Sequence, residues 1–214
     1  MTNTLVAGER TKLRIKSTWF RAGSPKSPQQ NASAMAFITW RVSQHMLKQM
    51  RSAHFDIEVG QQYFAFTREV LVFMSQVIDR WAFERMSPDE RMAFVSSLVR
   101  RVAEILEENE DRLMGPPDSA HASHFDQFID QFNALSIHYA DFGLANGMPD
   151  FAFVRYLGHR IESLMPQKDQ RWVIDQIMAI EIPEALEMLQ RGMQGVLSTE
   201  PRPQRSSRAL NTGD

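Results

Sequence analysis

Apolar residues recur with a period close to 3.6 residues from position 29 to position 198, and this pattern constrains the fold most. Such spacing gathers apolar side chains on one face of an α-helix. It predicts helices over about 31–52, 57–85, 88–114, 119–142, 150–165 and 168–198. No strand is predicted between positions 29 and 198. We therefore expect an all-α fold, a bundle of about six helices.

Two prolines indicate where helices start or change direction. Ser87 is followed by Pro88 and Glu90, which together are typical of a capping box with proline at the first helical position. Pro183 lies within the last apolar stripe, where its ring clashes with the carbonyl of Ala179. We expect a kink or a new helix start there.

Charge divides the chain into three parts. Residues 1–28 carry six basic residues against one acidic residue, residues 29–198 carry a net charge of −8, and residues 199–214 carry +1. This distribution predicts a basic arm, an acidic helical body and a tail. The tail is rich in Ser, Pro and Arg, so we expect it to be flexible. A Gly-Pro-Pro break at 115–117 leaves two arrangements open for the body, one bundle or two three-helix halves, 29–114 and 118–198.

The arm has the alternating pattern of an extended strand, with its cations on one face and two aromatic residues after them. It could add to the sheet edge of a protein partner, or bind nucleic acid by charge and stacking. It could also fold back onto its own body. The predicted partner-binding residues are Arg10, Lys12, Arg14, Lys16, Trp19, Phe20 and Arg21.

The sequence lacks the residues that several kinds of functional site require. The chain has no cysteine, which excludes disulfides, thiolate metal sites and a cysteine nucleophile. It also lacks phosphate-binding glycine motifs and the Glu-x-x-His pairs of carboxylate-bridged metal centres. The nearest metal-like spacing follows Asp118 at three-residue steps. The candidate metal ligands are His121, His124 and, further along, His138. Alternatively, the first two belong to a polar helix start, and His138 is a hydrogen-bonded residue at the core edge.

Two helical segments share a pattern. Residues 94–106 and 153–165 both read Phe-Val-x-x-Leu-x-x-Arg followed by a β-branched residue. The similarity indicates either a duplicated helix hairpin or two amphipathic helices that resemble each other by chance.

These observations favour a non-enzymatic interaction or regulatory subunit that engages a protein partner through the basic arm, an apolar groove of the bundle, or both. The alternatives are a nucleic-acid-associated protein and a metal-binding or small-molecule-binding helical enzyme. No cofactor is expected. The sequence does not decide whether the chain forms a homo-oligomer. Charges interrupt the most apolar stretch, 63–83, so we expect no membrane span. Missing cysteines and a missing secretory signal favour the cytoplasm.

Overall fold

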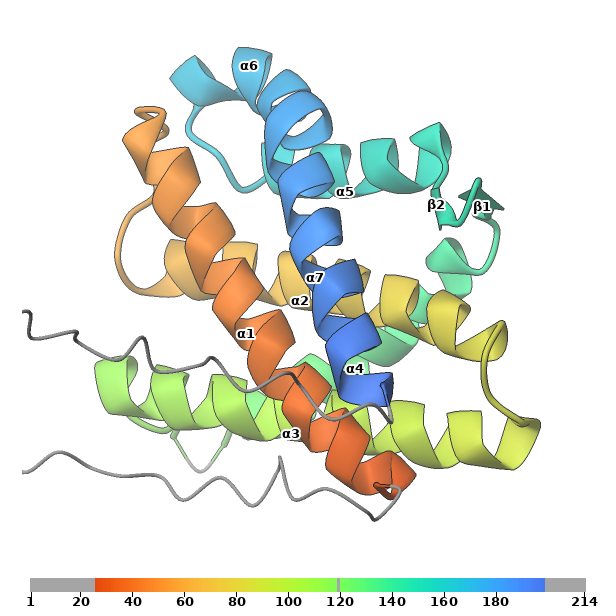
Figure 1. Ribbon diagram of the computed structural model, residues 1–214. Coiled ribbons are helices and arrows are strands. Elements are labelled where there is room, and N and C mark those ends of the chain that lie inside the picture. Colours follow the sequence, from red (N-terminus) through yellow and green to blue (C-terminus); the bar gives the residue numbers. More distant parts are fainter. Residues whose placement is uncertain (1–25, 119, 199–214) are drawn as a thin grey trace, which may run out of the picture. The chain divides into compact units, whose positions relative to one another are not determined.

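The computed structural model describes residues 26–118 and 120–198 (Figure 1). The predicted arm residues, from Arg10 to Arg21, and the predicted tail lie outside the described residues. The predicted all-α bundle is confirmed. Its elements in chain order are α1 (Pro28–Ser52), α2 (Gln61–Phe83), α3 (Pro88–Met114), α4 (His124–Tyr139), β1 (Leu144–Ala145), β2 (Met148–Pro149), α5 (Phe151–Glu162), α6 (Gln167–Gln176), a π-helical turn (Ile177–Glu181) and α7 (Ile182–Leu197).

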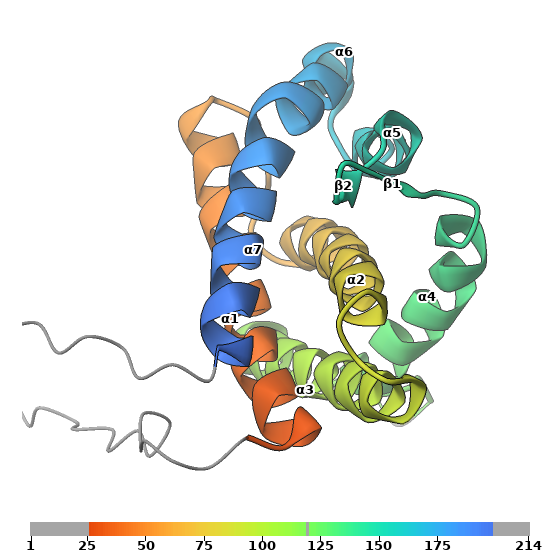
Figure 2. The ribbon, with the colours of Figure 1, turned by 45° about the vertical axis from the view of Figure 1, so that its right-hand side comes forward.

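Helix α2 lies at the centre of the bundle because it is apolar around most of its circumference. Figure 2 shows α2 with the other helices arranged around it, and α1, α3, α4 and α5 all contact it. Phe73 and Trp81 are fully or almost fully buried on this helix. Helices of both predicted halves contact each other, as α1 does with α7 and α3 with α4. The division into halves stays a prediction.

Side-chain caps set the starts of the helices. The Ser87 capping box forms as predicted, with the Ser87 side chain accepting from the backbone of Glu90. A second capping box, of Ser27 and Gln30, starts α1 at Pro28, three residues before the expected start. Hydrogen-bonding side chains at helix starts satisfy backbone N–H groups that have no partner within the helix.

Two expected helix starts were wrong. Helix α2 begins at Gln61 and not near 57, because Gly60 precedes it with φ +111, a backbone conformation outside the helical range. Helix α4 begins at His124 and not near 119, because the Ser123 side chain accepts from the Asp126 backbone and caps the helix there.

The prediction that the body holds no strand was also wrong. Within the expected loop, β1 and β2 pair antiparallel through Leu144–Pro149 and Ala145–Met148. Asn146 and Gly147 join them with φ of 55 and 76. Positive φ at both central residues, with the sequence Asn-Gly, is typical of the tightest hairpin turns. Two-residue strands are too short to leave an alternating pattern in the sequence.

The disturbance expected at Pro183 takes the form of a wider helical turn. Pro183 lies in the first turn of α7, directly after the π-helical turn. The Ile182 N–H donates to the Ile177 carbonyl, a step of five residues instead of four. The wider turn places the proline where α7 begins, so α6 and α7 follow each other with the π-helical turn between them.

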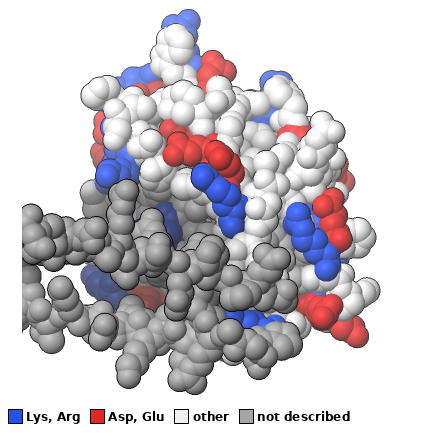
Figure 3. All heavy atoms as spheres, viewed as in Figure 1, with Lys and Arg blue, Asp and Glu red and all other residues white. Residues whose placement is uncertain are grey.

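Negative charge is concentrated on one part of the described bundle. Residues 104–130 hold eight Asp and Glu against one Arg, whereas the other described residues hold fifteen of each sign. We call this segment, the C-terminal half of α3 through the first half of α4, the acidic edge. On the face shown in Figure 3, basic and acidic side chains lie next to each other. No helix among the described residues is long and apolar enough to cross a membrane.

Candidate functional site

A groove of about 500 Å³ lies between α2, α3 and α4. Each helix contributes residues three or four positions apart, which is the spacing of one helix face. The groove is therefore formed by three helix faces and needs no loop to shape it. Its lining residues are Gln76, Asp79, Arg80, Pro88, Arg91, Met92, Val95, Ser96, Phe132, Ser136 and Ala140.

The charged floor of the groove is internally neutralised. Arg91 donates from Nε and Nη2 to the two carboxylate oxygens of Asp79, both at 2.7 Å. Such bidentate pairing is the strongest geometry for an arginine and a carboxylate. The hydrogen bond to Asp79 also raises the pKa of Arg91. Arg80 lies 3.7 Å from the same carboxylate and donates to the Tyr139 carbonyl at 2.9 Å.

The uncharged polar residues of the floor are also paired. Gln76 donates from Nε2 to the Ser136 hydroxyl at 2.6 Å, and this hydroxyl donates to the Phe132 carbonyl at 2.7 Å. The serine hydroxyl is thus held by an amide and a carbonyl, and among the described residues no histidine or carboxylate forms a hydrogen bond with it.

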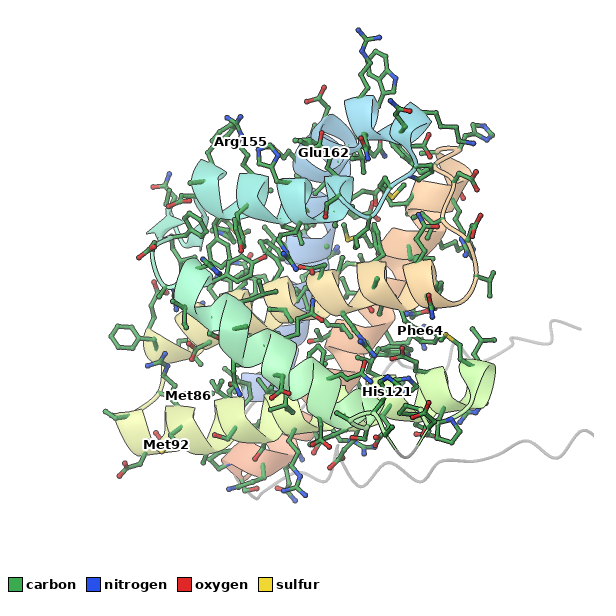
Figure 4. The ribbon with its side chains drawn as sticks, turned by 180° about the vertical axis from the view of Figure 1, so that it is seen from behind. Phe64, Met86, Met92, His121, Arg155 and Glu162 are labelled. Carbon is green, nitrogen blue, oxygen red and sulfur yellow. The ribbon has the colours of Figure 1, made fainter. Side chains whose placement is uncertain are left out.

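The rim of the groove is apolar and exposed. Met92, on the outer side of α3, is 68% exposed (Figure 4). Val95 and Phe132 are partly exposed beside it. Phe83 is also 68% exposed at the end of α2, and the Arg91 guanidinium lies 5.1 Å from its ring centroid. Apolar side chains gathered around a hollow are a common feature of surfaces that bind another chain.

The three candidate metal ligands are not brought together. His121 is exposed and lies 2.7 Å from Asp118 (Figure 4). His124 is buried, with Nδ1 2.7 Å from Asp111 and Nε2 3.6 Å from Glu110. His138 is fourteen residues further along α4, which places it about 21 Å away.

Each of these histidines has a local role instead. His121 and His124 occupy the polar start of α4, which was the alternative interpretation. His138 is exposed and stacks near Tyr156, with ring centroids 5.9 Å apart, so it is not the core-edge residue that helix geometry suggested. Within the described ranges, no group of three or more histidine and acidic side chains could hold a metal ion.

Sequence reasoning missed the residues that form the groove. Asp79 and Arg91 are twelve positions apart on different helices, and their sequence neighbourhoods contain no known motif. Exposed apolar residues at the polar face of a predicted helix, such as Met92, were the only available signal.

Comparisons with protein-family models, with curated proteins and with solved structures find no match.

Proposed function

We propose that this protein is a helical interaction subunit that holds an apolar segment of a protein partner in the groove between α2, α3 and α4. The observation that carries the proposal is an exposed apolar rim beside a polar floor whose groups already bind one another. A partner that covers this floor leaves both carboxylate oxygens of Asp79 paired with Arg91, which keeps the desolvation penalty of this charge small.

The acidic edge suggests the chemistry of the partner. The groove uses the first half of α3 and the second half of α4, and the acidic edge continues along the remaining halves of these two helices. Asp126 and Asp130 on this edge are exposed and form no ion pair among the described residues. An amphipathic helix with apolar residues in the groove and Lys or Arg over the acidic edge would match both surfaces.

The basic arm would make a second contact in this proposal. Arg10, Lys12, Arg14 and Lys16 would bind an acidic surface of the same partner, and Trp19 would add apolar contact area. Nucleic-acid binding is less favoured, since the described residues carry an excess of acidic groups that repel phosphates.

The experiment uses the full chain as bait, identifies the recovered partner and repeats the binding with purified components. Met92→Asp should raise the Kd by about tenfold or more, since it places a charge in the apolar rim. Ile137→Asp is the matched control, because Ile137 is 73% exposed on α4 but does not line the groove. Equal affinity of both variants would overturn the role of the groove.

The contribution of the arm is measured separately. A chain that starts at residue 26 should bind the same purified partner more weakly and with a smaller dependence on salt. Unchanged affinity and salt dependence would remove the arm from the proposal and leave the groove as the binding surface.

A further inference from the structure

A second hollow, of about 380 Å³, lies between α1 and the start of α2, and it shares no residue with the groove. Its volume is that of a small-molecule site. Most of its lining comes from one face of α1, and a single residue of α2 completes it. The lining residues are Gln44, Leu47, Lys48, Arg51, Ser52 and Tyr63.

Arg51 is held in place before any ligand arrives. Its Nε and Nη2 donate to the Ile57 carbonyl at 3.2 and 2.7 Å. Its guanidinium also lies 5.5 Å from the centroid of the Tyr63 ring. A fixed guanidinium loses little side-chain entropy when it binds an anion, and its Nη1 is the nitrogen left for that purpose.

Gln44 adds a donor that lacks an acceptor. The Tyr63 hydroxyl donates to Gln44 Oε1, which fixes the orientation of the amide. The other end of the amide, Nε2, is buried and has no hydrogen-bond partner among the described residues. Buried donors in folded proteins are nearly always paired, and this one has almost no accessible surface, so an anion in the hollow reaches it only when a neighbouring side chain shifts.

The charge of the hollow is also uncompensated. Lys48 and Arg51 line it without any Asp or Glu, and neither forms an ion pair within residues 26–118 and 120–198. In the groove, by contrast, Asp79 neutralises the neighbouring arginines. Burial raises the pKa of Tyr63, so its hydroxyl keeps its proton and adds no negative charge.

We infer that this hollow binds a small anion through a carboxylate or phosphate group held by Lys48, Arg51 and the floor around Gln44. Ser52 also lines the hollow, but its hydroxyl already donates to the Lys48 carbonyl at 3.0 Å. The inference does not depend on the proposed function, because the hollow and the groove share no residue.

Calorimetric titration of the full chain with inorganic phosphate and, separately, with citrate tests the inference and distinguishes the two kinds of oxyanion. Sodium chloride at equal ionic strength is the reference. We expect saturable binding of at least one of the two anions with a stoichiometry of one. No saturable heat with either anion would overturn the inference.

Variants show whether the hollow is the place of binding. Lys48→Met should weaken binding by about tenfold, and Gln44→Glu should abolish it by placing a carboxylate oxygen where the amide nitrogen lies. Arg41→Met removes the same charge from an exposed position of α1 outside the hollow and should leave binding unchanged. Equal loss in Lys48→Met and Arg41→Met would overturn the inference. Met92→Asp should bind the anion normally.

Discussion

The contact of α1 with α7 differs from the contacts of α2 with α4 and α5 in what joins the helices. Helix α7 turns Leu189, Met193 and other apolar residues inward, and the polar link between α1 and α7 that the structure shows is the pair His45–Glu184. Helix α2 also packs apolar rings against α5, since the ring centroids of Phe73 and Phe153 lie 5.3 Å apart. In addition, it reaches α4 and α5 through buried polar side chains. Glu69 accepts from Gln131 of α4 and Arg160 of α5.

The two kinds of contact have different roles. Apolar contacts contribute mainly to stability, whereas buried polar contacts set the position of one helix along another. Apolar contacts tolerate small shifts of one helix along another, because many packed arrangements bury a similar area. A buried carboxylate with two fixed donors tolerates few such shifts, since a lost partner leaves a charge buried without compensation. Two turns further along α2, Gln76 forms a second polar contact with α4 by donating to Ser136. The polar contacts therefore fix how α4 and α5 sit on α2.

The largest effect is expected from breaking the polar contact at Glu69. Its side chain is 4% exposed, whereas that of Arg160 is 39% exposed. Arg160→Ala leaves the carboxylate buried without its cation, so we expect the free energy of unfolding to fall by about 3 kcal/mol. Glu69→Gln should cost less, because the freed arginine can reach water. Urea denaturation of both variants measures the two losses.

The shared helix pattern supplies a matched control. Arg101 occupies the position in 94–106 that Arg160 occupies in 153–165, but it pairs with Glu104 at the surface. Arg101→Ala should change the free energy of unfolding by no more than about 0.5 kcal/mol. If Arg101→Ala and Arg160→Ala cost the same, the polar contacts of α2 would have no special role.

These two arginines also show how far the sequence can predict the structure. Periodicity and caps predicted the helices because both depend on residues within one or two turns. The same local pattern surrounds Arg101 and Arg160, yet one arginine lies at the surface and the other meets a buried carboxylate on a distant helix. The partner depends on how helices cross, which no local window contains.

The candidate site was harder to predict for the same reason. The groove needs three helix faces to meet, and Asp79 and Arg91 become floor residues only after α2 and α3 pack together. The predicted metal ligands followed sequence spacing, but the start of α4 at His124 separated them. The basic arm was identified from charge, and its binding role stays a prediction.

Two glycines of α7 provide a test of the apolar contact between α1 and α7, with a smaller expected effect. A Cβ at Gly192 would lie 2.9 Å from Ile38 Cγ2 of α1, whereas a Cβ at Gly195 would meet nothing within 4 Å. Alanine favours a helix over glycine by about 1 kcal/mol. Gly195→Ala should therefore stabilise the protein by about that amount. Gly192→Ala should lose this gain, since the Ile38 side chain or the helix that carries it must shift to make room for the Cβ.

Thermal denaturation of the two glycine variants gives the comparison directly. We expect the free energies of unfolding to differ by about 1–2 kcal/mol in favour of Gly195→Ala. An equal gain in both variants would show that Ile38 makes room for the Cβ without cost, and that the contact of α1 with α7 is looser than the Gly192–Ile38 distance implies.

The smallest effect concerns Glu181, a buried acid in the π-helical turn. Burial raises the pKa of this carboxyl, although Gln176 donates to it at 2.9 Å. The folded protein therefore binds this proton more tightly than the unfolded chain does. Its contribution to stability is greatest below the usual carboxyl pKa and falls as pH rises through the raised pKa.

Glu181→Gln should consequently gain stability relative to the native chain as pH rises from the usual carboxyl pKa through the raised one, by less than about 1 kcal/mol. Asp150 gives the opposite sign, because backbone N–H groups of Phe153 and Gly143 lower its pKa. Asp150→Asn should lose stability relative to the native chain as pH rises through the interval between the lowered pKa and the usual carboxyl pKa, and the loss should stay constant above that interval. Urea midpoints from acidic to neutral pH measure both differences. Parallel curves for Glu181→Gln and the native chain would mean that the carboxyl ionises as easily in the fold as in water, and that the π-helical turn opens it to solvent.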